Sequence, residues 1–241
     1  DGMTVEELGP YLSENGENIR EQLRTRKYKP QPVRRVEIPK PDGGVRNLGV
    51  PTVVDRFVQQ AVAQVLTPIF EEQFHDHSYG FRPNRCAQQA VLKALEMMND
   101  GHSWIVDIDL AKFFDTVDHD KLMTIFGRTI KDGDVISVVR KFLVSGVMID
   151  DEYEDTVVGT PQGGNISPLL ANVMLNELDK ELEANMDEVL KIVVMGRACR
   201  NTANIKNRQP IGQMYVKADF ELSEFFDAIV ADELNVKNVT F

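Results

Sequence analysis

Carboxylates directly follow an apolar stretch in the middle of the chain, and this combination limits the folds open to it. The sequence WIVDIDLAKFFDTVDHD, residues 104–120, holds five aspartates in seventeen residues. Its first part, Trp104 to Ile108, has the apolar character of a buried strand, so we expect a core strand that carries Asp107 and leads into Asp109. An isolated aspartate at a strand end is commonly a turn former or a helix cap. A carboxylate buried there needs a counter-charge, most simply a divalent cation held by oxygen ligands.

Around this stretch the sequence alternates between helical patterns and hairpins. VRRVEIPKPDGGVRNLGVP predicts a hairpin around Asp42-Gly43-Gly44, and GVMIDDEYEDTVVG predicts another that turns at residues 150–152. Asn84 is expected to cap one helix, and another is expected to end near Pro68. The order of elements fits an α+β fold with an antiparallel sheet. Periodicity and capping residues predict helices over residues 5–26, 52–68, 84–100, 118–126, 134–144 and 167–183.

Charge is distributed unevenly along the chain. The 241 residues carry a net charge of −11, which argues against general affinity for nucleic acid, because phosphate binding needs local positive charge. Residues 20–56, however, hold ten basic and four acidic side chains. This segment is either a solvated run of charges or a basic lobe that binds nucleic acid. No apolar run is long enough to cross a bilayer, no secretory signal is visible, and Cys86 and Cys199 match no metal spacing, so we expect a cytoplasmic protein with free thiols.

Two further stretches offer groups that bind anions or nucleotides. GTPQGG, residues 159–164, places backbone N–H groups before a helix that begins at Ser167, which suits a phosphate, a sugar or a base. In IPKPDGGVRNLG, Lys40 and Arg46 flank the hairpin turn and can converge on one polyanion. Taken singly, the first stretch is more often an ordinary turn, and the second more often carries solvent-facing cations.

Together and in this order, the blocks resemble those of a bacterial group II intron-encoded reverse transcriptase, or maturase. The resemblance rests on IPKPDGGVRNLGVPTVVDRFVQQAV, SYGFRPNRCAQQAV, VDIDLAKFFDTVDHDKL and GTPQGGNISPLLANVMLNELD, and it covers residues 1–183. It implies the fingers and part of the palm of a right-hand polymerase. It also implies RNA-directed DNA polymerase (nucleotidyltransferase) activity, in which two Mg²⁺ ions assist the attack of a primer 3′-hydroxyl on a triphosphate. The implied partners are intron RNA, a primer–template and a dNTP.

The resemblance also implies roles for individual residues. Asp109 matches the first metal ligand, with the carbonyl of Leu110 beside it, and Phe114 matches the platform for the sugar of the nucleotide. Lys40 and Arg46 match the cations of the fingers that clamp the triphosphate. The remaining candidates are Gln162 and Gly163, which would face the incoming nucleotide, Arg34 and Arg35, which would contact nucleic acid, and Arg82, which would support the template or the fingers.

One part of that family's active site is missing from the sequence. Such an enzyme needs a Tyr-x-Asp-Asp turn after the Pro-Gln-Gly helix to supply the remaining aspartate ligands, and no such turn follows Leu182. The adjacent pair Asp150-Asp151 lies before the loop instead. Residues 184–241, with NIKNRQP as the most specific element, resemble the C-terminal part of a bacterial isoleucyl-tRNA synthetase. We therefore expect two domains, 1–183 and 184–241, the second a small mixed helix–strand tail joined near Ala184.

These observations leave three functions open. The chain is a reverse transcriptase domain of a maturase, truncated before the Tyr-x-Asp-Asp turn and so inactive as a polymerase by itself. Alternatively, it is a non-catalytic module that binds intron RNA, or a non-functional chimera with a synthetase tail. Primer extension and the salt dependence of RNA binding separate the first two, and the absence of hydrogen-exchange protection in Trp104–Ile108 is expected for the third.

Overall fold

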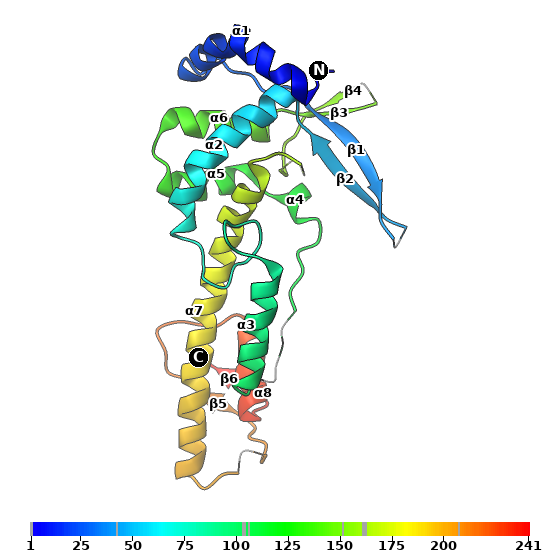
Figure 1. Cartoon of the computed structure of the whole chain (residues 1–241). Helices are drawn as coiled ribbons and strands as arrows, with labels where there is room; N and C mark the ends of the chain where they lie inside the picture. Colours follow the sequence, from blue (N-terminus) through cyan, green and yellow to red (C-terminus); the bar gives the residue numbers. More distant parts are fainter. Residues whose placement is uncertain are drawn as a thin grey trace. The chain divides into compact units, whose positions relative to one another are not determined.

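The computed structural model describes residues 2–41, 43–102, 105, 107–150, 152–160, 163–206 and 208–241. The chain forms two compact units, Asp1–Asn176 and Glu177–Phe241, and both contain helices and strands, as expected for an α+β chain (Figure 1). The elements are α1 (Val5–Arg24), β1 (Val33–Pro39), β2 (Val45–Val50), α2 (Val53–Glu71), α3 (Ala87–Asn99), α4 (Phe113–Thr116), α5 (His119–Thr129), α6 (Gly133–Leu143), β3 (Val147–Ile149), β4 (Glu152–Glu154), α7 (Ser167–Thr202), β5 (Met214–Tyr215), α8 (Glu224–Leu234) and β6 (Val239–Thr240).

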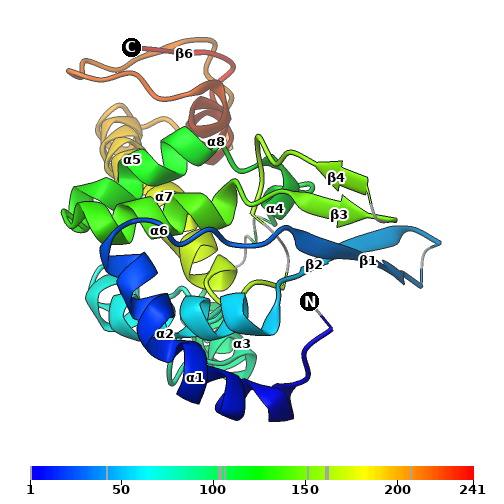
Figure 2. The same cartoon turned by 90° about the horizontal axis from the view of Figure 1, so that it is seen from above.

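The first unit contains a sheet with the strand order β2-β1-β3-β4, whose strands lie side by side in Figure 2. Both predicted hairpins are present, since β1 pairs antiparallel with β2 and β3 pairs antiparallel with β4. β1 and β3 run parallel, with Val33 opposite Val147, so the expectation of a purely antiparallel sheet is wrong. A long helical connection joins these two strands, and no tight turn fixes their relative direction.

The prediction of a core strand at Trp104–Ile108 is also wrong, as far as the structure describes this segment. Ile105, Asp107 and Ile108 lie outside any strand, and the side chains of Ile105 and Ile108 are exposed. A strand requires a neighbour that completes its hydrogen bonds, and none of the described strands pairs with this segment. The apolar composition was therefore not sufficient to place the segment in the core.

Helix starts follow local capping chemistry in most places. The side chain of Thr52 accepts a hydrogen bond from the backbone N–H of Asp55 at the start of α2. The side chain of Asp118 likewise accepts one from the backbone N–H of Lys121 at the start of α5. Asn84 is not the cap that was expected for α3, because its φ of 59° is left-handed and Cys86 occupies the cap position. α2 continues past Pro68 to Glu71, since Phe70 is buried in the core and a proline removes only one donor from the last turns.

Each unit has hydrophobic residues of its own at its centre. The main core of the first unit joins α2, α5, α6 and the start of α7 around Leu66, Leu122, Phe126 and Leu170. A smaller cluster around Ile19, Tyr28, Val58 and Phe142 attaches α1 to it. The second unit packs α8 and the later part of α7 around Val230, with β5 and β6 paired in parallel. The later part of α7, β5, α8 and β6 follow one another along this unit, which is the mixed helix–strand composition expected for the tail.

None of the helices in the described part of the chain is long and apolar enough to span a membrane.

Candidate nucleotide-binding site

The loop 159–164 is fastened to the segment around α4. The N–H of Thr160 donates to the carbonyl of Phe114 (2.6 Å), and the N–H of Gly159 donates to the carbonyl of Val117 (2.8 Å). Nε2 of the buried His119 donates to the carbonyl of Gly159 (2.5 Å). Phe114 and Thr160, which are 46 residues apart in sequence, are thus held together by a backbone hydrogen bond.

Glycines in this loop allow three close approaches. A Cβ on Gly163, whose φ is +119°, would lie 2.8 Å from the carbonyl oxygen of Gly49 in β2. A Cβ on Gly159, whose φ is +90°, would lie 2.9 Å from the carbonyl oxygen of Phe114. A Cβ on Gly164 would lie 2.9 Å from Oε1 of Gln59 in α2. The glycines therefore bring the loop against the hairpin, α2 and α4 at once.

Three of the predicted cations share one face of the β1–β2 hairpin. Arg46 lies opposite Ile38, and Arg34 is four residues before Ile38 on β1. The N–H of Lys40 donates to the carbonyl of Gly44 (2.7 Å), so the ladder continues to the tip of the hairpin. Because side chains alternate between the two faces of a strand, Arg34, Lys40 and Arg46 lie on the same face, and Arg35 lies on the other.

The predicted aromatic platform is half-buried. The rings of Phe113 and Phe114 meet edge to face, with their centres 5.5 Å apart. Phe113 packs against the main core, which fixes α4 and with it the position of Phe114. The short helix begins after Lys112, whose φ of 51° is left-handed. Gln162, which was expected to face the nucleotide, lies outside the described residues.

The residues of the predicted metal site do not fit a two-metal centre. Asp109 and Leu110 lie in an exposed segment without regular structure. Among the described residues, no group of three or more His, Cys, Asp or Glu side chains could hold a metal ion. A catalytic pair of Mg²⁺ ions requires several carboxylates that converge on it. The aspartates that the structure describes therefore do not converge on one site that could hold a pair of Mg²⁺ ions.

Arg82 is buried and fully engaged within the protein. Its guanidinium pairs with Glu71 (2.8 Å) and donates to the carbonyls of His75 (2.6 Å) and Ser78 (2.9 Å). It also lies over the ring of Phe74, 5.4 Å from its centre. These contacts fix the segment between α2 and α3, so the side chain acts on the geometry of this segment from within the fold.

Two buried polar residues, Gln59 beside the loop and Thr160 within it, were missed by the sequence analysis. Gln59 is 4% exposed and Thr160 is 3% exposed, and neither Oε1 of Gln59 nor Oγ1 of Thr160 has a hydrogen-bond partner among the described residues. The signal for Gln59 was available, because it lies four residues before Ala63 and seven before Leu66, at helical spacing with these buried residues. Thr160 gave no such signal.

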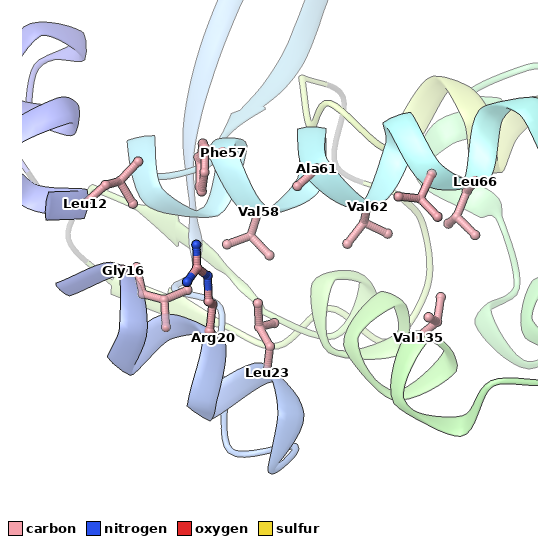
Figure 3. A pocket seen from close by; sticks show the side chains of 12 residues that line it. Leu12, Gly16, Arg20, Leu23, Phe57, Val58, Ala61, Val62, Leu66 and Val135 are labelled. Atoms are coloured by element: carbon pink, nitrogen blue, oxygen red, sulfur yellow. The ribbon is translucent and has the colours of Figure 1, made fainter.

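An apolar groove of about 480 Å³ lies between α1 and α2 (Figure 3). Leu12, Leu23, Phe57 and Val62 line it, and Arg20 is the one charged residue of its lining. A groove with so few polar groups cannot orient a nucleotide, so it is not the candidate site.

Known proteins match a large part of this chain. Residues 38–195 match the family model described as reverse transcriptase (RNA-dependent DNA polymerase). Protein YkfC of Escherichia coli is 39% identical over 186 residues, which are 76% of this chain and 49% of that protein. Group II intron-encoded protein LtrA of Lactococcus lactis is 41% identical over 171 residues, which are 70% of this chain and 28% of that protein. The chain thus spans at most about half the length of these relatives.

A further match concerns a different class of protein. Isoleucine–tRNA ligase of Clostridium kluyveri is 48% identical over 67 residues, which are 28% of this chain and 6% of that enzyme. This match covers a small part of both chains, whereas the reverse transcriptase model covers well over half of this one. The chain therefore belongs to the reverse transcriptase family, and it carries a reverse transcriptase domain of the kind found in group II intron-encoded proteins.

Proposed function

We propose that the chain forms the fingers and part of the palm of a right-hand polymerase and binds nucleic acid and nucleotide without polymerising. One observation carries this proposal. The loop 159–164 is brought against the cation-bearing hairpin and Phe114. Asp109, in contrast, lies in an exposed segment, and the described residues include no cluster of carboxylates that could hold a metal ion. The nucleotide side of a polymerase site is thus supported by the fold, and the metal side is not.

The expected loss of polymerase activity follows from the charge on the reacting groups. Two Mg²⁺ ions would stabilise the attacking and leaving oxygens, and this contribution amounts to several kcal/mol. Because about 1.4 kcal/mol corresponds to a tenfold change in rate, loss of most metal ligands should lower the rate of polymerisation by a factor on the order of 10³ or more. The Tyr-x-Asp-Asp turn that would provide these ligands is absent from the sequence.

Primer extension tests this part of the proposal. With Mg²⁺, an RNA template, a DNA primer and dNTPs, we expect no product above background from the wild-type chain or from Asp109→Ala. Robust synthesis by the wild type that disappears in Asp109→Ala would contradict the proposal, because it would show a working metal centre around Asp109.

Binding of nucleic acid is proposed to use the hairpin face that carries Arg34, Lys40 and Arg46. Each phosphate neutralised by a cation releases counterions, so the affinity for RNA should fall steeply as salt concentration rises. Arg34→Gln and Arg46→Gln are each expected to weaken binding and to reduce the salt slope by about one, since each removes one cation.

Two matched variants complete this experiment. Lys237→Gln removes an exposed cation from the second unit and is expected to leave RNA affinity unchanged. Asp109→Ala should also leave it unchanged, since binding does not require the metal. An RNA affinity that falls equally in Arg34→Gln, Arg46→Gln and Lys237→Gln would indicate general electrostatic attraction and would overturn the role of the hairpin face.

We also propose that the segment 184–241 has the same ancestry as the C-terminal part of an isoleucyl-tRNA synthetase. The partial match to isoleucine–tRNA ligase and the separate hydrophobic core around Val230 support this proposal. Sequencing of the DNA around the codon for Ala184 tests it. A reading frame that continues there into a Tyr-x-Asp-Asp turn would show that the join is a rearrangement and that the parent is an ordinary reverse transcriptase.

A further inference from the structure

Phe81 is an exposed aromatic residue with a strained backbone. Its side chain is 75% exposed, and its φ of 53° lies in the left-handed region. A bulky side chain rarely adopts this conformation, which glycine would adopt freely. Burial of the ring gives no explanation for phenylalanine at this position, because most of the ring faces solvent.

The residues on both sides of Phe81 are held firmly by the rest of the first unit. Nδ2 of Asn172 in α7 donates to the carbonyl of Gly80 (2.9 Å). On the other side, Arg82 is buried and pairs with Glu71 (2.8 Å). The segment between α2 and α3 accordingly lies against the start of α7 in Figure 1. Backbone strain persists where the surroundings fix it in this way, and such places are often binding sites.

Phe81 lines a cavity of about 560 Å³ between α2 and the start of α7. Gln60 and Gln64 of α2 line it, together with Asn165 and Pro168. Nδ2 of Asn165 donates to Oε1 of Gln60 (3.0 Å), so the two amides fix each other's position. The cavity thus combines an aromatic ring with amide groups at fixed positions.

We propose that this cavity binds an unpaired base of a single-stranded nucleic acid, stacked on Phe81. Proteins recognise single-stranded bases through this combination, in which an aromatic ring stacks on the base and amides pair with its edge. Two residues of the cavity are next to the candidate site in the sequence, because Asn165 follows the loop 159–164 and Gln60 follows Gln59. The carboxyl group of Glu71, which also lines the cavity, is paired with Arg82 and does not repel the ligand as a free charge would. This inference rests on the proposed binding of nucleic acid.

A short single-stranded RNA that carries 2-aminopurine provides a direct test, because stacking quenches the fluorescence of this base. We expect the wild-type chain to quench it on binding. Phe81→Leu should abolish the quenching and weaken binding about tenfold, whereas Phe81→Tyr should retain both. Phe57→Leu, which changes a half-exposed phenylalanine on α2 outside this cavity, should behave as the wild type.

A second variant separates loss of binding from loss of fold. In Phe81→Gly, glycine adopts the left-handed backbone conformation without strain, so the Tm should be no lower than that of the wild type. The quenching of 2-aminopurine fluorescence should nevertheless be lost, because the ring is absent. The salt slope should remain that of the wild type, because no charge is removed. Undiminished quenching in Phe81→Leu and Phe81→Gly would overturn this inference and leave the hairpin proposal standing. A wild-type chain that binds no RNA would overturn both.

Discussion

A buried carboxyl group holds the start of the hairpin to the start of α2. Asp55 is 2% exposed, and it accepts hydrogen bonds from the hydroxyl groups of Tyr28 (2.7 Å) and Thr52 (2.7 Å) and from the N–H of Gln31 (3.0 Å). A buried carboxyl group is tolerated when donors surround it in this way. The contact fixes where β1 leaves the helical part of the first unit, and it therefore positions the cations of the hairpin.

Asp55→Asn is expected to destabilise the first unit. An amide replaces one acceptor oxygen by a donor, so at least one of the three buried donors loses its partner, at a cost of about 1 to 3 kcal/mol. Urea denaturation followed by circular dichroism measures this change. Glu37→Gln, an exposed change on β1, provides the control and should leave the free energy of unfolding unchanged. Equal stability of Asp55→Asn and wild type would show that these hydrogen bonds do not hold the hairpin.

Tyr28 makes stability depend on alkaline pH. Burial, together with its hydrogen bond to Asp55, raises the pKa of the Tyr28 phenol above its ordinary value of 10.0. Below about pH 10 both the folded and the unfolded chain keep the proton, and the contribution is fully present. At higher pH the unfolded chain loses the proton while the folded chain keeps it, so stability falls by up to about 1.4 kcal/mol per pH unit.

The Tyr28→Phe variant isolates this contribution. Other groups titrate in the same range, so the informative quantity is the difference in free energy of unfolding between wild type and variant. We expect the wild-type advantage at pH 8 to shrink steadily above about pH 10. A difference that stays constant from pH 8 to pH 11 would mean that the phenol of Tyr28 titrates normally in the folded chain.

At the level of elements, the loop 159–164 depends on close approach between main chains. Gly163→Ala would place a Cβ 2.8 Å from the carbonyl oxygen of Gly49, so the loop must move away from β2. Gly101→Ala is the matched control, since Gly101 has a φ of +99° but nothing within 4 Å of its Cβ position. Both variants bear the strain of a left-handed backbone, and Gly163→Ala alone bears the contact with β2.

We expect Gly163→Ala to be less stable than Gly101→Ala by about 1 to 3 kcal/mol, the range found when a side chain is forced into a packed space. Limited proteolysis should also cut the loop faster in Gly163→Ala. Equal stability and equal cleavage of the two variants would show that the loop does not pack on the hairpin in solution.

At the level of the whole molecule, the two units have separate hydrophobic cores. Val230 is fully buried in the second unit, where it packs among residues of that unit. Val230→Ala should cost about 1.5 to 3 kcal/mol of the stability of the second unit, from the lost burial of its side chain. Hydrogen exchange read by mass spectrometry should then show faster exchange in α8.

The same measurement should show unchanged protection in α5 and α6, which belong to the core of the first unit. Leu122→Ala provides the reciprocal case, because Leu122 is fully buried in that core. If Val230→Ala accelerated amide hydrogen exchange in both units to the same extent, the chain would unfold as one cooperative body. The division into two units would then have no energetic meaning.

The sequence by itself determined the elements whose cause lies within a few residues. The hairpin around Gly43 and Gly44 and the helix start at Ser167 are local, so turn and capping chemistry predicted them. The ordered blocks also predicted the family, which the comparison with known proteins confirmed. Roles of single residues at the site stay predictions.

Only the tertiary structure decided what depends on a distant partner. The run at Trp104–Ile108 has the composition of a core strand, but its described residues are exposed, because a strand needs a neighbour to supply hydrogen bonds and cover. The parallel pairing of β1 with β3 and the contact of Gly163 with Gly49 likewise depend on residues far apart in sequence. Composition shows which residues can be buried, but packing against a particular neighbour determines which of them are.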